Sequence, residues 1–179
     1  RNFGFLCIGN FIGDHVKGKA YLDYPETIQN GILLHRKIDY FTDQHFLFKK
    51  NVTLLFPQFR HYSRVIVDMF FDHFLANQWN YYHPEPLEQF SKRFYAMIEQ
   101  YSSILPYKTK KILPVISKHN WFLAYSTFDG MEKILSQMSQ RTKFSSNLSL
   151  ALEALKKNYT KIALDFKIFF SELEDFVKK

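Results

Sequence analysis

The sequence contains a single cysteine, Cys7, among 179 residues. One thiol cannot form an internal disulfide framework or a cysteine-rich zinc site, and it favours a reducing compartment, the cytoplasm. Glycine and proline are also scarce, at six each, so the chain has little of the turn material that an all-β fold needs. These absences favour a helical, intracellular protein.

Long hydrophobic runs are absent as well. The most apolar stretch, residues 3–16, is interrupted by Asn10 and Asp14 and is shorter than the roughly 20 residues that cross a bilayer. The sequence also has no P-loop, no dinucleotide-binding glycine motif and no nucleophile elbow. We therefore expect no membrane span and none of the chemistry that those motifs support.

Aromatic residues and positive charge are what the sequence does have. Aromatics make up 18% of the chain, and 24 basic residues exceed 17 acidic ones, for a net charge of +7. Most aromatic residues fall at helical core spacing, so we assign them to packing and expect no nucleic acid as partner. The positive charge then favours another kind of acidic partner.

Apolar residues recur at helical spacing along most of the chain. The spacing predicts helices over residues 26–50, 63–79, 84–103 and 148–170, with a polar linker at 141–147. No segment shows the alternation of a strand. The predicted fold class is all-α, a single-domain helical bundle over residues 1–179.

Histidine and aspartate residues cluster in the first half of the chain. His35 and Asp39 are four residues apart on one predicted helix, and Asp68 and Asp72 are four apart on the next. All four fall on or beside the apolar faces, where a charged carboxylate needs a cation or several hydrogen-bond donors. Imidazole and carboxylate ligands without thiolate suit manganese, iron or magnesium, and zinc stays open.

The wider pattern predicts one shared metal site. Its five candidate ligands each have apolar neighbours, and they are Asp14, His35, Asp39, Asp72 and His73. The structural alternatives are a helix cap for Asp14 and buried ion pairs for the others.

Three ordered motifs extend this pattern. They are Gly9-Asn10-Phe11-Ile12-Gly13-Asp14-His15-Val16-Lys17-Gly18, Gly31-Ile32-Leu33-Leu34-His35-Arg36-Lys37-Ile38-Asp39-Tyr40-Phe41-Thr42-Asp43 and Asp68-Met69-Phe70-Phe71-Asp72-His73-Phe74-Leu75-Ala76. With matching segments at 24–25, 121–125 and 159–169, the sequence resembles the acyl carrier protein phosphodiesterases, which are similar to HD-type metal phosphohydrolases.

The resemblance implies an HD-hydrolase-like enzyme of fatty acid biosynthesis. Such an enzyme hydrolyses the phosphodiester that joins 4′-phosphopantetheine to a serine of holo acyl carrier protein, using a divalent metal, with manganese the expected ion. It also implies that the five candidate ligands bind the metal and that catalysis depends on Asp72, Asp39 and Asp68. The family's opening motif carries a further ligand histidine, which has no counterpart in Arg1-Asn2-Phe3-Gly4.

Basic residues next to the motifs are candidates for substrate binding. We predict that Lys17, Arg36 and Lys37 attract the phosphate or an acidic helix of the carrier protein, with solvated surface residues as the alternative. Two other functions stay open. One is an HD-type phosphohydrolase acting on a nucleotide or small phosphodiester, and the other is a non-catalytic module that binds acyl carrier protein.

Overall fold

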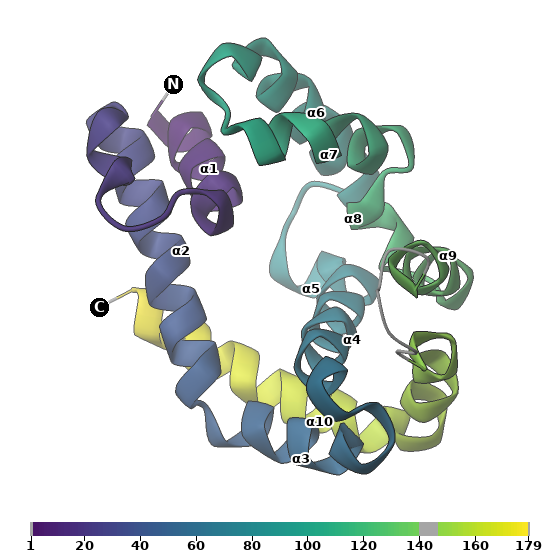
Figure 1. The fold of residues 1–179 in the computed structure, drawn as a ribbon. Helices are drawn as coiled ribbons and strands as arrows, with labels where there is room; N and C mark the ends of the chain where they lie inside the picture. The colour runs from purple at the N-terminus through teal and green to yellow at the C-terminus, as the bar shows by residue number, and fades with distance from the viewer. Residues whose placement is uncertain (1, 140–146, 179) are drawn as a thin grey trace.

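The computed structural model describes residues 2–139 and 147–178 (Figure 1). This described part contains helices and 3-10 turns and no strand, which confirms the predicted all-α class. The longer helices are α1 (Asn2–Ile12), α2 (Glu26–Gln44), α3 (Phe46–Phe59), α4 (Ser63–Asn77), α6 (Leu87–Gln100), α7 (Tyr107–Lys118), α9 (Phe128–Ser139) and α10 (Ala151–Val177). The predicted linker at 141–147 lies outside the described residues, except for Asn147.

Buried side chains form two apolar cores. One lies among α1, α2, α6 and α7 and includes Ile8 and Ile32. The other lies among α3, α4, α9 and α10 and includes Phe48 and Phe166. Trp121, at the start of the short helix α8 (Trp121–Ala124), packs against both cores. None of the helices in the described part of the chain has the length and hydropathy that crossing a bilayer requires.

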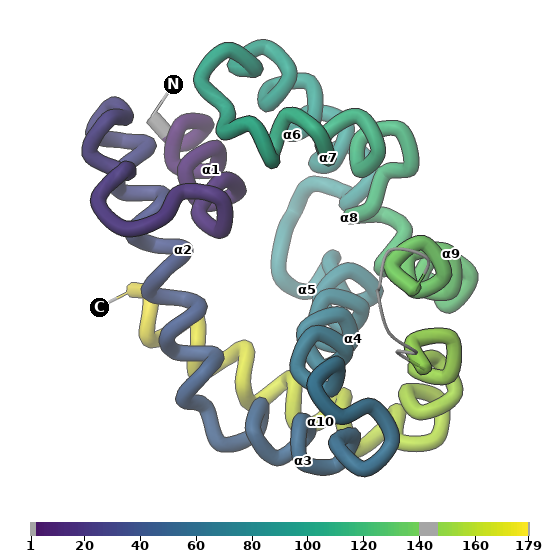
Figure 2. The backbone as a smooth tube through the Cα atoms, in the orientation of Figure 1, coloured from purple at the N-terminus to yellow at the C-terminus, as the bar shows by residue number. Residues whose placement is uncertain are grey.

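Helices α2 and α3 follow one another along one side of the molecule, and α10 runs beside them (Figure 2). The prediction of one helix over 26–50 is therefore wrong at its end, because His45 interrupts it. The backbone of His45 is extended, and its Nδ1 accepts a hydrogen bond from the Leu47 N–H at 3.3 Å, which caps α3.

The other predicted helices exist with shifted ends. Helix α4 ends at Asn77, two residues before the predicted limit of 79. Helix α6 starts only at Leu87, because Pro86 keeps an extended backbone with ψ near 141°. Helix α10 begins at Ala151, after a 3-10 turn, and continues to Val177 instead of stopping at 170.

Helices α1 and α2 touch through their backbones. A Cβ on Gly9 would collide with the carbonyl oxygen of Ile28, and a Cβ on Gly31 would collide with that of Leu6. Only glycine permits so close an approach. This contact places the turn after α1, which contains Asp14, beside the face of α2 that contains His35.

Candidate metal centre and its pocket

Two neighbouring elements bring three of the predicted ligands together. Asp14 lies in the 3-10 turn η1 (Gly13–His15) directly after α1, while His35 and Asp39 project from α2 one helical turn apart. Nε2 of His35 is 3.4 Å from Oδ1 of Asp14 and 3.2 Å from Oδ2 of Asp39. One ligand atom from each residue lies within 4.8 Å of the other two. We refer to these three residues as the triad.

The triad has the character of a cation site. Nε2 of His35 is buried, and among the described residues it has no hydrogen bond of good geometry, although two carboxylates are close. The contact with Asp39 is the main cause that raises the pKa of His35, against the opposing effect of burial. One imidazole and two carboxylates form a donor set for a hard or borderline divalent ion.

Gly13 makes room for the histidine. A Cβ on Gly13 would overlap the imidazole of His35, so the ring occupies space that any other residue would fill. The carboxylates remain open, since the side chains of Asp14 and Asp39 are 70% and 57% exposed. A substrate could therefore reach an ion held by the triad.

A pocket of about 670 Å³ opens beside the triad. Asp14, His35 and Asp72 of α4 all line it, so Asp72 faces the same space as two of the triad residues. The solvent-accessible carboxylate contradicts the prediction of a core-facing aspartate. The apolar side of α4 packs into the second core, and Asp72 instead points into the pocket.

Surrounding protein changes the acidity of both α4 carboxylates. Although Asp72 borders the pocket, the surrounding protein reduces the hydration of its carboxylate and raises its pKa to about 6. Burial, followed by the negative charge of Asp72, raises the pKa of Asp68 to about 7. The positive charge of Arg64 opposes this rise, and the more weakly acting charges of Asp39 and Asp14 add to it.

The structure does not bring His73 to the triad. Its Nδ1–H donates to the carbonyl oxygen of Tyr125 at 2.7 Å, and its Nε2 accepts from the hydroxyl of Tyr159 at 3.2 Å. The ring is buried and stacks on Phe128, with ring centroids 5.3 Å apart. Burial lowers the pKa of His73, so the ring is neutral, and both of its nitrogens are occupied within the second core.

The three predicted substrate-binding cations have different surroundings. Arg36 donates through Nη2 to the carbonyl oxygens of Val16 and Gly18, at 2.9 and 2.8 Å, so it holds the turn that follows Asp14. Nζ of Lys37 lies 4.9 Å from the ring centroid of Phe176 on α10. Of the three, Lys17 is exposed, whereas Arg36 and Lys37 are partly buried.

Sequence reasoning missed the aromatic lining of the pocket. Phe11, Phe94, Phe122 and Tyr125 all line it, although we assigned aromatic residues to core packing alone. Helical periodicity cannot separate a side chain that meets another helix from one that borders a cavity. The compact run Trp121 to Tyr125 was the one available signal.

A polar contact across the pocket rim also escaped prediction. Nδ1 of His15 lies 2.7 Å from Oγ1 of Thr109, which joins the turn carrying Asp14 to α7, 94 residues away. Lys17 and Lys108 both lie close enough to His15 for their charges to lower its pKa, although burial is the larger cause. The negative charge of Asp14 acts on the same imidazole in the opposite direction and raises its pKa.

Comparisons with known proteins address the family of the whole chain. A sequence profile described as acyl carrier protein phosphodiesterase matches residues 4–173. The acyl carrier protein phosphodiesterase of Klebsiella pneumoniae strain 342 is 28% identical over 169 residues, covering 92% of this chain and 86% of the relative. The protein of that name from Pectobacterium atrosepticum is 26% identical over 172 residues, covering 96% and 89%. No solved structure matches the chain. The chain belongs to the acyl carrier protein phosphodiesterase family.

Proposed function

We propose that this protein is a metal-dependent phosphodiesterase that removes 4′-phosphopantetheine from holo acyl carrier protein and returns the apo form. One observation carries the proposal: Nε2 of His35 is buried between two open carboxylates at the edge of a large pocket. The names of the relatives also point to acyl carrier protein as the substrate.

The triad would hold the divalent ion, with manganese the expected one, through Asp14, His35 and Asp39. Such an ion neutralises charge on the phosphate and makes water more acidic. The phosphodiester would lie at the triad, and Lys17 would add positive charge at the rim.

The carboxylates of α4 would accept and donate the protons of the reaction. Asp72, with a pKa of about 6, is mostly ionised at neutral pH and would accept the proton of the attacking water. The water oxygen forms a bond to phosphorus, and the bond between phosphorus and the serine oxygen breaks. Asp68, with a pKa of about 7, is partly protonated at neutral pH and is the candidate donor to the serine oxygen.

Positive charge near Asp14 suits the carrier protein as partner. Lys17 lies in the loop after the turn that contains Asp14, Lys108 lies on α7, and the charges of both act on His15. An acidic protein would be attracted to these lysines, and the attraction would weaken with salt. The expected place of the reaction is the cytoplasm, as the single cysteine suggests.

The test is release of phosphopantetheine from holo carrier protein, with the substrate verified by mass, in the presence of manganese and after chelation. We expect release only with metal, and loss of release in Asp14→Asn. The exposed Asp23→Asn is the matched control and should retain activity.

Failure of the wild-type protein to release the arm with manganese present would contradict the proposal. Turnover of small phosphodiesters alone would favour the HD-type phosphohydrolase. Binding of the carrier without turnover or metal retention would favour the non-catalytic module.

A further inference from the structure

A second cavity of about 240 Å³ lies next to the pocket that Asp14 and His35 line. Leu75, Ala76, Trp79 and Leu87 line this second cavity and do not line the first. We refer to the second cavity as the inner chamber. Its own lining is entirely apolar apart from the indole N–H of Trp79.

The inner chamber continues the first pocket. Both are lined by the same four residues, Asp72, Phe90, Phe122 and Tyr125. None of the triad residues lines the inner chamber. Asp72 therefore stands between the triad on one side and an apolar space on the other.

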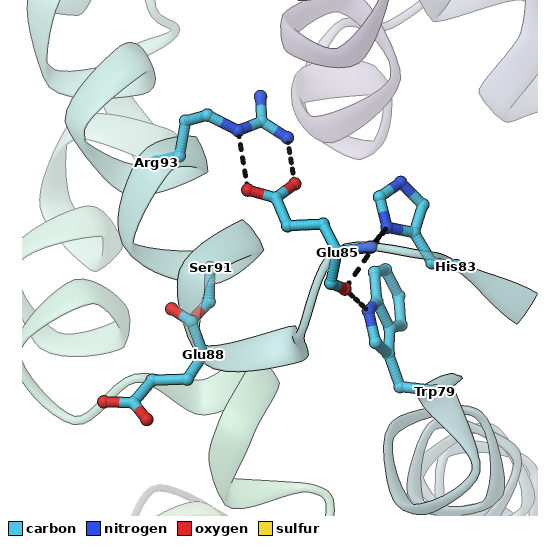
Figure 3. Close-up of polar contacts among 6 residues, drawn as sticks. All are labelled: Trp79, His83, Glu85, Glu88, Ser91 and Arg93. Carbon is cyan, nitrogen blue, oxygen red and sulfur yellow. Dashed lines mark hydrogen bonds and ion pairs between the residues drawn. The ribbon is translucent and has the colours of Figure 1, made fainter. Parts of the chain in front are cut away.

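The Trp79 end of the chamber is held in place by a polar network that faces away from it. Figure 3 shows the indole N–H of Trp79 donating to the carbonyl oxygen of Glu85, at 2.7 Å. The carboxylate of Glu85 in turn accepts two hydrogen bonds from Arg93, at 3.1 and 2.6 Å. The Trp79 ring also packs on Phe90, with centroids 4.8 Å apart.

This network gives the chamber a defined size and chemistry. Because the indole N–H is already satisfied outside the cavity, Trp79 presents an apolar ring to the space. An anionic group would lose hydration there and would be repelled by the carboxylate of Asp72. An uncharged, mostly apolar group fits.

We propose that the inner chamber binds the uncharged, thiol-bearing end of the pantetheine arm, and that Ala76 and Trp79 limit the size of the group it accepts. This inference rests on the proposed function. With the phosphate at the triad, the arm would lead along the aromatic side of the pocket and past Asp72. Apolar burial at its far end would then add to binding without touching the reacting atoms.

The test fills the chamber with Ala76→Phe and uses Ala96→Phe, on the exposed side of α6, as a size-matched control. Two carrier proteins serve as substrates. One carries the full arm, and the other carries the N-methyl amide of phosphopantothenate, which stops short of the thiol-bearing end.

We expect Ala76→Phe to lower kcat/KM about tenfold or more for the full arm and less than about twofold for the short arm. The control Ala96→Phe should leave kcat/KM unchanged for both arms. Equal effects of Ala76→Phe on both arms, or no effect on either, would overturn the inference. If Ala76→Phe does not fold by circular dichroism, Ala76→Leu takes its place with the same expectations.

A binding measurement separates this inference from the proposed function. Free pantetheine should raise the melting temperature of the wild-type protein and of Ala96→Phe, and should not raise that of Ala76→Phe. If the wild-type protein releases neither arm but the melting temperatures change as expected, the proposed reaction is contradicted and the assignment of the chamber is supported. If pantetheine does not shift the wild-type protein, the chamber assignment fails whatever the activity.

Discussion

Gly13 and the imidazole of His35 are in direct contact, and the ring fills the space where a side chain at position 13 would begin. The glycine lies at the start of the turn that carries Asp14, so one contact aligns two ligands of the triad. A small residue in the turn thus decides whether the imidazole can lie between the carboxylates.

Gly13→Ala should weaken binding of manganese about tenfold or more, because the added methyl displaces the His35 ring. Titration calorimetry on the metal-free protein measures this. The control is Gly18→Ala in the same turn region, where a Cβ meets no atom within 4 Å but φ is +56°. That control should lower the free energy of unfolding by about 1 kcal/mol and leave the manganese affinity unchanged. An unchanged affinity in Gly13→Ala would contradict the role of the contact.

His73→Ala should destabilise the protein without changing its affinity for manganese. The substitution removes two hydrogen bonds and a stacked ring from the second core, which should cost about 3 kcal/mol in the free energy of unfolding. Denaturant unfolding and metal titration at a temperature where the variant is folded separate the two effects. If manganese affinity falls as it does in His35→Ala, His73 is a ligand, as the sequence pattern first suggested.

Asp68→Asn should stabilise the metal-free protein at pH 8 more than at pH 4.5. The folded-state pKa of Asp68 is about 7, above its ordinary value of 3.8, so the folded state binds the extra proton more tightly than the unfolded state. The stability that protonation supplies is present below the ordinary value and is lost as pH rises through about 7. Asparagine avoids that loss. Urea unfolding at both pH values tests the sign, and an equal effect at the two values argues against a raised pKa.

Asp165→Ala should lower the free energy of unfolding by about 2 kcal/mol. The buried carboxylate accepts from Nζ of Lys50 at 2.9 Å and from Nδ2 of Asn51 at 3.0 Å, and it thereby joins α10 to α3. The effects of Asp165→Ala and Lys50→Ala should be less than additive in the double variant, because both remove the same ion pair. Additive effects would show that the pair contributes nothing to stability.

The helix boundaries show which features of the fold apolar periodicity can predict. Apolar periodicity correctly predicted helices in the four segments, but it did not detect the interruption at His45. That interruption depends on the His45 side chain capping α3 and lying 3.0 Å from Glu172 on α10. His45 and Glu172 are 127 residues apart, so the periodicity of a short segment cannot reveal their contact.

The sequence likewise predicted one part of the candidate site, and the other part depended on packing. The spacing of His35 and Asp39 placed them on one helical face, and no later contact could separate them, because four residues make about one turn. Asp72 and His73 are adjacent on a helix, so their side chains point in different directions. The sequence does not determine which of the two faces the pocket. Packing of His73 against Tyr125 and Tyr159 turned Asp72 toward the triad.

By itself, the sequence determined the all-helical class, the His35–Asp39 pair and the family, because each depends on local spacing or on ordered motifs. The sequence named Asp14 as one of five candidate ligands, and only the tertiary structure decided that it meets that pair, that Arg36 binds backbone carbonyls and that aromatic residues line a pocket. Each of these depends on contacts between segments far apart in the chain. Those contacts follow from how whole helices pack, as at Gly9 and Gly31, rather than from the preferences of any one segment.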